Sequence, residues 1–450
     1  MTIMMNKRPS VAVVGAGISG LGAAWLLSRG AEVSLFEAQP RFGGHANTVD
    51  TPYGVPVDTG FIVYNEPAYP NLTGLFAQLG VETIATDMSF ALSIDGGRYE
   101  YAASPRPREL FAVPSNFLRP RYWRMLADMR RFFADANALV EAGAGGDEPL
   151  GDFVVRKGYS SEFIEDHLLP MAAAIWSAPQ REILAFPARS LALFYHNHRL
   201  LQFTDRVPWR TVKGGSRAYV RRVLADTPGQ HHAESPVVAV RRDGARVAVH
   251  TANSVAGVFD QVVLACPGDR ALALLDQPTN PEGTLLSAFR YARNDAYLHT
   301  DRRFLPRRPA VWSSWNVLKT STDRADRNVN VSYWMNRLQS LSTPEPLVVS
   351  LNPVTEPDPD RTIGHWAYQH PIMDTVAFNA KASLPSIQGT RGIWYCGAHL
   401  GYGFHEDGLS AGLAVAEAIL AGTGIRRPWR TPDVSPAGLA VAAPALPLAA

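Results

Sequence analysis

The feature that most constrains this chain is a glycine-rich turn near its start, between an apolar run and an amphipathic segment. Residues 11–14 are apolar, residues 18–28 have helical spacing, and residues 33–36 form a second β-branched and aromatic run. This order predicts a βαβ unit. In the turn Gly15-Ala16-Gly17-Ile18-Ser19-Gly20, the first glycine permits a tight bend and the second lets the backbone approach a pyrophosphate. The third allows close packing of helix on strand.

The same unit predicts how a dinucleotide binds. The unpaired N–H groups at the helix N-terminus, with about half a positive charge, favour phosphates without any basic side chain. Glu37 closes the second strand and should accept hydrogen bonds from ribose hydroxyls. We therefore expect the dinucleotide to contact Gly15, Gly17, Ile18, Ser19, Gly20, Glu37 and Ala38.

Length and charge narrow the class of protein. At 450 residues the chain exceeds the size at which one hydrophobic core usually stops growing, so two lobes are expected. A net charge of +2 does not indicate bulk binding of nucleic acid. With only Cys266 and Cys396, there is neither a disulfide framework nor a thiolate cluster for a metal, and a reducing cytoplasm fits best.

The apolar run near the start could be mistaken for a secretory signal, because Lys7 and Arg8 precede it. Its glycines sit where a phosphate loop needs them, which argues against that interpretation. No later segment has an apolar run long enough to span a bilayer, so we expect a soluble or peripheral protein.

Later segments extend this fold. Residues 237–240, 246–250, 261–265 and 392–396 have strand patterns, and residues 269–275 and 408–420 have helical ones. We expect these strands to share one sheet with the βαβ unit. The predicted fold is α/β: a discontinuous Rossmann-type dinucleotide-binding domain with a mixed α+β substrate domain. The expected boundaries are 1–66, 206–280 and 390–425 for the first domain, 67–205 and 281–389 for the second, and 426–450 for a flexible tail.

The choice of FAD over NAD comes from Arg41-Phe42-Gly43-Gly44, directly after Glu37. The block of residues 11–44 resembles the start of the flavin amine oxidase, phytoene desaturase and protoporphyrinogen oxidase superfamily, whose R-x-G-G segment lines FAD. The resemblance implies that the first domain is a GR2-like FAD-binding domain, with FAD contacts at Arg41, Gly43 and Gly44. The chain departs from the commonest form at His45, where many members have a second arginine, and this implies a modified flavin contact.

Three further blocks resemble the same superfamily. Asp58-Thr59-Gly60-Phe61 implies contacts at Thr59 and Gly60. Lys213-Gly214-Gly215-Ser216 precedes the strand predicted for residues 236–240, where the backbone of Val238 is implied to contact adenine. The third block runs from Gly397 to the helix start at Asp407-Gly408-Leu409, and it implies contacts at Gly397, Asp407, Gly408 and Leu409. Its usual acidic residue is replaced by His399.

The helix expected after Asp407 has a physical reason to face the flavin. Reduced flavin carries negative charge along one ring edge, which the N–H groups and dipole of a helix N-terminus stabilise. The expected chemistry is hydride transfer between a substrate C–H and flavin N5. The match of Asp407-Gly408 to the superfamily's helix start implies that His405 faces the flavin ring, where members have an aromatic residue that faces the substrate. An imidazole there can orient substrate or move a proton, and Tyr64 is a weaker candidate for the same cavity. A hydrogen bond to the loop backbone is the alternative role for His405.

Other chemistries lack their residues. The sequence has no G-x-S-x-G, H-E-x-x-H or Walker motif. His196 and His198 are two residues apart and would not share a helix face, so no metal is expected.

The substrate rests on resemblance alone. The glycine blocks resemble a bacterial subgroup associated with cyclopropane-fatty-acid-synthase-like methyltransferases, which implies desaturation or isomerisation of a methylated or unsaturated fatty acyl chain. A small molecule is the other substrate class, with oxidation of an amine or amino acid as the alternative reaction. A non-catalytic flavin-binding partner subunit is the alternative from another class. The oligomeric state is left open.

A basic and aromatic segment suggests where such a lipid is met. Residues 106–133 interleave seven arginines, among them Arg106, Arg121, Arg124 and Arg130, with six aromatic residues. This mix suits an interfacial helix at the inner membrane surface. The alternative is a surface helix whose aromatic residues pack inward. We expect a cytoplasmic protein with peripheral membrane contact through this segment.

Overall fold

The structure, a computed structural model, describes residues 8–103, 107–142, 148–176, 180–202, 207–252, 254–320 and 330–431. Most of the predicted tail, from residue 432 onward, and Arg106 of the basic segment lie outside these residues. Within them, no helix combines the length and the apolar composition needed to cross a bilayer.

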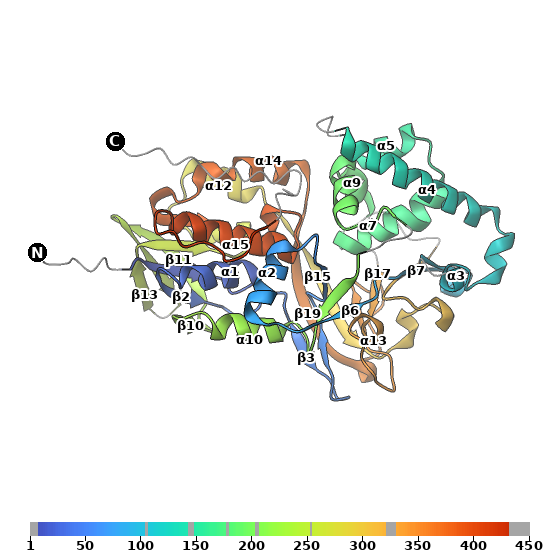
Figure 1. Ribbon diagram of the computed structural model, residues 1–450, viewed down its shortest axis with the longest axis horizontal. Helices are drawn as coiled ribbons and strands as arrows, with labels where there is room; N and C mark the ends of the chain where they lie inside the picture. The colour runs from blue at the N-terminus through green and yellow to red at the C-terminus, as the bar shows by residue number, and fades with distance from the viewer. Residues whose placement is uncertain are drawn as a thin grey trace, which may run out of the picture.

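A five-stranded parallel sheet forms one lobe (Figure 1), and its strand order is β10-β2-β1-β14-β20. Buried apolar residues, most of them β-branched, make β1 and β14 apolar on both faces, as a covered parallel sheet requires. The bounds are β1 Ser10–Val14, β2 Glu32–Phe36, β10 Gln230–His232, β14 Gln261–Leu264 and β20 Ile393–Tyr395.

Two helices from opposite ends of the chain cover this sheet together, α1 (Ile18–Leu27) and α15 (His405–Ile419). They approach closely because glycines face each other's backbone. A Cβ on Gly412 would overlap the carbonyl oxygen of Ser19, and one on Gly22 would meet the Leu409 side chain at 2.5 Å. This contact positions the last segment of the chain beside the glycine-rich turn.

The expectation that residues 237–240 and 246–250 join the parallel sheet is wrong. They form a separate antiparallel sheet of β11 (Val237–Asp243), β12 (Arg246–Thr251) and β13 (Ser254–Phe259). The hairpin turn at Asp243 and Gly244 pairs the first two strands with each other, and β12 pairs with β13 on its other edge.

The other lobe is built on a seven-stranded mixed sheet, in the order β19-β15-β18-β17-β16-β7-β8. Strands from residues 67–205 and from residues 281–389 meet here, where β16 pairs in parallel with β7 and all other pairs are antiparallel. The bounds are β7 Phe90–Ile94, β8 Tyr99–Ala103, β15 Tyr291–His299, β16 Trp315–Lys319, β17 Asn330–Trp334, β18 Val348–Leu351 and β19 Thr362–Pro371.

A group of helices packs beside this sheet, at the end of the molecule away from the parallel sheet (Figure 1). Its aromatic and aliphatic residues form one buried cluster, which includes Phe132, Phe163 and Leu191. The bounds are α4 Pro120–Glu141, α5 Leu150–Arg156, α7 Leu169–Trp176, α8 Gln180–Ala185 and α9 Ala188–Asn197.

Short elements complete the fold. Two small sheets lie between the lobes, β3 (Thr48–Asp50) with β4 (Pro56–Asp58), and β5 (Val63–Asn65) with β9 (Trp209–Val212) and β6 (Thr83–Thr86). The remaining longer helices are α2 Pro70–Leu79, α10 Arg217–Ala225, α11 Gly268–Leu274, α12 Asn280–Ser287 and α14 Thr375–Ser383. The predicted α/β class is confirmed.

The first residues of the predicted tail are packed rather than free. The Trp429 ring stacks on Trp25 with centroids 5.5 Å apart, and the Arg427 guanidinium binds the Glu417 carboxylate at 2.7 Å. Burial of the Trp25 ring explains this contact, because Trp429 covers apolar surface that would otherwise face water.

Candidate functional site

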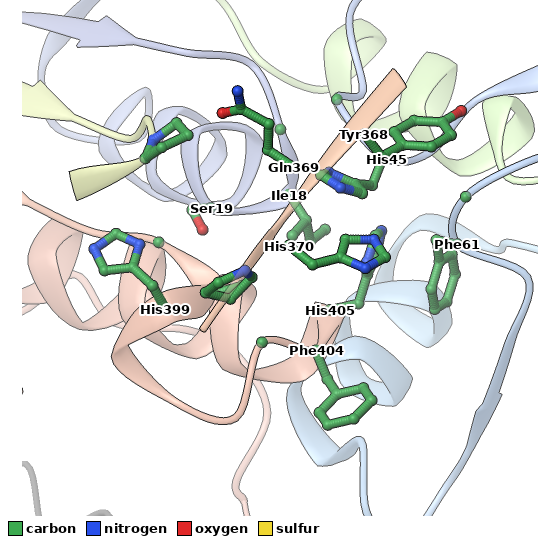
Figure 2. A pocket seen from close by; sticks show the side chains of 18 of the residues that line it. Ile18, Ser19, His45, Phe61, Tyr368, Gln369, His370, His399, Phe404 and His405 are labelled. Carbon is green, nitrogen blue, oxygen red and sulfur yellow. The ribbon is translucent and has the colours of Figure 1, made fainter. Parts of the chain in front are cut away.

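A cavity of about 930 Å³ opens at the carboxyl ends of β1, β2 and β14 and continues toward the second lobe. This position follows from the fold, because ligands of open α/β sheets bind beyond the carboxyl ends of the strands. Figure 2 shows residues that line it, from both lobes.

The β1–α1 turn forms one wall. Gly15 has φ of +100°, and a Cβ there would lie 2.7 Å from the Ala265 carbonyl oxygen. A Cβ on Gly17 would meet no atom within 4 Å, because this residue borders the cavity. Ile18 and Ser19 also line it. Gly20 does not, and its role is packing, since a Cβ there would overlap the Gly15 carbonyl.

Glu37 ties this turn to the next strand. Its carboxylate accepts hydrogen bonds of 2.9 Å from the backbone N–H groups of Ala16 and Gln39. Glu37 and Ala38 line the cavity beside the turn. Each carboxylate oxygen can accept a second bond, so this placement leaves capacity for a ribose hydroxyl.

The R-x-G-G segment folds back on the glycine-rich turn. The Arg41 guanidinium donates to the Gly44 carbonyl oxygen at 2.8 Å, and the Gly43 N–H donates to the Ala16 carbonyl oxygen at 2.8 Å. Gly44 and His45 line the cavity, whereas Arg41 and Gly43 lie behind them. Arg41 and Gly43 therefore support the wall that Gly44 presents.

His45 brings an unsatisfied polar atom to this wall. Its Nε2 is buried and has no hydrogen-bond partner, while its ring bonds to the backbone of Gln369. Burial, with the nearby Arg41 charge, lowers the pKa of His45 to about 4. Thr59 and Gly60 adjoin it, and the Thr59 hydroxyl lies 2.7 Å from the Tyr368 hydroxyl.

At the strand predicted to meet adenine, Ser235 and Val237 line the cavity. The side chain of the neighbouring Val238 is 51% exposed and points to the opposite face of the strand. The predicted contact of adenine with the backbone of Val238 stays a prediction.

The C-terminal block differs from expectation in where its helix starts. Helix α15 begins at His405, and the Asp407 carboxylate accepts hydrogen bonds from the N–H groups of Tyr402 and Phe404 at 3.0 and 2.9 Å. Asp407, Gly408 and Leu409 therefore hold the helix and pack it on α1, and none of them lines the cavity. Gly397, Phe404 and His405 do.

His405 lies in the cavity wall, as Figure 2 shows. Its ring stacks on Phe61 with centroids 3.7 Å apart, and its Nε2 lies 3.0 Å from the Tyr219 hydroxyl. Burial, followed by the nearby His45, holds the pKa of His405 well below its usual range. A neutral imidazole here can accept or donate a proton through Nδ1, because Nε2 is engaged by Tyr219.

Tyr64 lies outside the cavity. It is buried against Tyr69 and Phe76, and its hydroxyl donates to the Thr83 hydroxyl at 3.4 Å. Along β5 the alternation of side chains turns Val63 toward the cavity and Tyr64 into the core, so Tyr64 is a packing residue.

Three further histidines line the cavity: His198, His370 and His399. The rings of His45 and His370 are 5.5 Å apart. Burial lowers the pKa of His198 and His399 to about 4 and that of His370 to about 3. His399 belongs to the C-terminal block that resembles the superfamily, whereas no motif marks His198 or His370.

Toward the second lobe the cavity becomes an apolar chamber. Aromatic and aliphatic side chains from β7, α7, α9 and the seven-stranded sheet form its wall. They are Met88, Phe90, Met171, Ile175, Trp176, Phe194, Leu200, Trp315, Tyr333, Leu338 and Leu351. Among the described residues, no group of three potential ligands is placed to hold a metal.

The fold and site together define a dinucleotide-binding oxidoreductase. The comparisons with known proteins name its family. The sequence profile described as "Flavin containing amine oxidoreductase" matches residues 18–348. A probable polyamine oxidase 4 of Arabidopsis thaliana is 31% identical over 157 residues, and tryptophan 2-monooxygenase of Pantoea agglomerans pv. gypsophilae is 36% identical over 122. These matches cover 34% and 24% of the chain, and 29% and 21% of the two relatives.

Solved structures share the fold over almost the whole chain. Putrescine oxidase bound to putrescine superposes with a TM-score of 0.67 at 16% identity, covering 92% of this chain and 99% of that one. A fatty acid isomerase from P. acnes that produces CLA superposes with a TM-score of 0.66 at 15% identity, covering 93% and 99%.

The chain belongs to the flavin-containing amine oxidoreductase family, and it is an FAD-dependent enzyme. Three observations fit FAD to this cavity: the open space in front of Gly17, the position of Glu37, and the unpartnered Nε2 of His45. The individual FAD contacts stay predictions.

Proposed function

We propose that this enzyme desaturates or isomerises a fatty acyl chain held in the apolar chamber. The observation that carries the proposal is the chamber itself, because its wall presents hydrocarbon and aromatic surface over several elements of the second lobe. Each methylene of an acyl chain that moves from water into the chamber contributes about 0.8 kcal/mol of favourable transfer free energy. The chamber therefore selects long apolar substrates.

The charges of the cavity favour an acyl chain over an amine. Glu37 is the single carboxylate among its described lining residues, and it belongs to the glycine-rich turn. Of the lining arginines, Arg293 binds Asp295 at 2.8 Å. The buried histidines have lowered pKa values and are neutral at pH 7. A substrate ammonium would find no opposite charge in the chamber.

The chain's own residues supply positioning and a proton site. FAD, when bound, supplies the ring that accepts hydride from a C–H bond. Desaturation releases a hydride and a proton from neighbouring carbons, and His405 is the residue at the cavity wall that can take the proton, through Nδ1. The Phe61 ring stacks on His405, and Phe404 also lines the cavity.

The structural neighbours are consistent with either substrate class, since one oxidises putrescine and another isomerises a fatty acid. The fold alone does not decide between them. Supported by the chamber, we extend the proposal to methylated or unsaturated chains, of the kind made by cyclopropane-fatty-acid-synthase-like methyltransferases.

Anaerobic reduction of the purified enzyme tests the proposal. Phospholipids with unsaturated or methyl-branched chains should bleach the visible flavin band or yield a product with a shifted double bond, detected by mass spectrometry. Putrescine and tryptophan should do neither. Bleaching by an amine but not by any lipid would instead establish the amine oxidase alternative. Retained FAD with no reaction on either class would favour a non-catalytic flavin protein.

A further inference from the structure

An exposed apolar tip stands at the end of the molecule farthest from the parallel sheet, at the start of α4 (Figure 1). We define the aromatic tip as Phe111, Phe117, Leu118 and Trp123. Leu118 is 87% exposed, Phe117 47% and Trp123 46%. Large apolar side chains gathered at one place on a surface mark a binding site more often than scattered ones.

The aromatic side chains of the tip pack against one another. The ring centroids of Phe111 and Phe117 are 4.5 Å apart in a stacked arrangement, and those of Trp123 and Phe117 are 6.0 Å apart. The Trp123 indole N–H donates to the Phe117 carbonyl oxygen at 3.0 Å. This bond satisfies the one polar atom of the ring, so the indole can leave water without an unpaired donor.

Arginines surround the tip. Arg119 follows Leu118 directly, and its guanidinium donates to the Arg98 carbonyl oxygen at 3.1 Å, which brings the exposed Arg98 beside it. Arg121 and Arg124 lie in the first turns of α4 and are both exposed. Arg130 is seven residues after Trp123, two turns along the same helix face.

This arrangement has the two components of an interfacial anchor. Apolar side chains at a protruding turn can enter the boundary between headgroups and acyl chains, and arginines around them attract anionic headgroups. Two of the arginines are partly neutralised, since Arg121 pairs with Asp166 and Arg124 with Glu162. Arg98, Arg119 and Arg130 add cationic charge beyond those pairs.

The tip also adjoins the wall of the chamber. Phe111 packs on the buried Tyr122, and both belong to a hydrophobic cluster that includes Phe90 and Met171. The last two residues line the cavity. One hydrophobic cluster therefore connects the tip to the wall of the chamber.

We propose that the aromatic tip docks the enzyme on an anionic lipid bilayer. The structure moves the predicted contact from a helix face to this turn, because Tyr122 and Phe132, two aromatic residues of the basic segment, are buried in the core. Docking does not depend on the proposed acyl substrate, and a different substrate would leave it standing.

Sedimentation with vesicles tests docking on the full-length FAD-bound protein. The enzyme should bind vesicles that mix phosphatidylglycerol with phosphatidylcholine, bind phosphatidylcholine alone much more weakly, and dissociate as salt rises. Leu118→Glu should weaken binding at least about tenfold, because a carboxylate would face both the apolar boundary and the anionic headgroups. Val376→Glu is its matched control, a 59% exposed valine on α14 in the other lobe.

The arginines are tested with a second pair of variants. Arg98→Gln with Arg119→Gln should weaken binding about fivefold for each arginine. Arg241→Gln with Arg246→Gln removes the same charge from the β11–β12 hairpin and should leave binding unchanged. FAD content and circular dichroism check that every variant folds.

Three results would overturn docking. They are equal binding to neutral and anionic vesicles, no binding to either, and wild-type binding by Leu118→Glu. A gel-filtration mass that falls from dimer to monomer in Leu118→Glu would assign the tip to a second copy of the chain, and would also overturn it.

Discussion

The Tyr219 hydroxyl lies 3.0 Å from Nε2 of His405, so a residue of α10 sets the orientation of the imidazole at the cavity wall. Tyr219 is fully buried, and its ring contacts the rings of Phe61 and Phe76. Burial raises the pKa of Tyr219 well above its usual value, which keeps the hydroxyl protonated. The pair therefore exchanges one hydrogen bond while leaving Nδ1 of His405 for the substrate.

Removing the hydroxyl should slow the reaction without releasing FAD. Tyr219→Phe preserves the packed ring, so the fold should hold, but His405 loses its orienting bond. We expect the rate of flavin reduction by substrate to fall about tenfold, and about a hundredfold in His405→Ala, on the scale of a general acid–base group. Anaerobic stopped-flow spectroscopy measures both rates per bound flavin.

The double variant separates catalysis from structure. If Tyr219 acts through His405, Tyr219→Phe should cause no further loss once His405 is alanine. A His405→Ala protein that loses FAD but keeps its rate per bound flavin would assign His405 a structural role.

A second prediction contrasts two glycines of one turn. Gly17→Val should give a folded protein without FAD, because its side chain enters the open cavity where the pyrophosphate is expected. Gly20→Val should fail to fold stably, because a Cβ there would overlap the Gly15 carbonyl. Absorbance of released FAD and thermal unfolding distinguish the two outcomes. Wild-type FAD occupancy in Gly17→Val would contradict the expected phosphate position.

The glycine-rich turn could be predicted because its signals are local. Strand, turn, helix and acidic residue follow one another within residues 11–37, and each was found where expected. The start of α15 could not be placed as well. Asp407 was expected to begin that helix, yet it accepts backbone bonds from Tyr402 and Phe404 and lies in the third helical position. A capping carboxylate and a helix start look alike in sequence.

The chamber could not be predicted at all. His198 lies on the end of α9 and His370 on β19, and their proximity depends on how the two lobes meet. Neither position carries a spacing that would indicate it.

Acid should destabilise the protein through its buried histidines. Besides His231, six histidines have pKa values lowered strongly by burial: His45, His198, His299, His370, His399 and His405. Between about pH 4 and 6.5 these histidines are protonated in the unfolded chain and neutral in the folded chain. The free energy of unfolding therefore decreases as the pH is lowered through this range. Burial also raises the pKa of Asp58 and Asp407 to about 6 and that of Glu406 to about 7, which opposes this loss. Because six imidazoles outnumber three carboxyls, the free energy of unfolding should show a net decrease at acidic pH.

Urea unfolding at pH 7.5 and pH 5.5 measures this effect. Each imidazole should contribute about 1 kcal/mol to the fall in the free energy of unfolding. His370→Gln should flatten the pH dependence, because it removes one imidazole whose pKa burial lowers. Equal stability at both pH values, or an unchanged pH dependence in His370→Gln, would contradict the prediction.

The last prediction concerns the arginines of α4, which look equivalent in sequence but differ in what they neutralise. Arg121 donates through Nε to the Asp166 carboxylate at 2.8 Å, and that carboxylate is fully buried. Arg124 pairs with Glu162, whose side chain retains some exposure. Removal of Arg121 leaves the buried Asp166 carboxylate with one ion-pair partner among the described residues, Lys319, whose Nζ lies 3.7 Å from it.

Arg121→Gln should therefore lower the free energy of unfolding by about 2 kcal/mol, less than the 3–5 kcal/mol of a fully buried pair because Arg121 is 46% exposed. Arg124→Gln should change it by less than about 0.5 kcal/mol, as expected for a surface pair. Adding Asp166→Asn to Arg121→Gln should recover part of the loss, because an amide costs less to bury than an unpaired carboxylate. If the double variant is less stable than Arg121→Gln alone, the cost lies in lost contacts and not in the buried charge. Urea unfolding followed by circular dichroism decides, and its result also shows which arginines can be removed in vesicle experiments without weakening the fold.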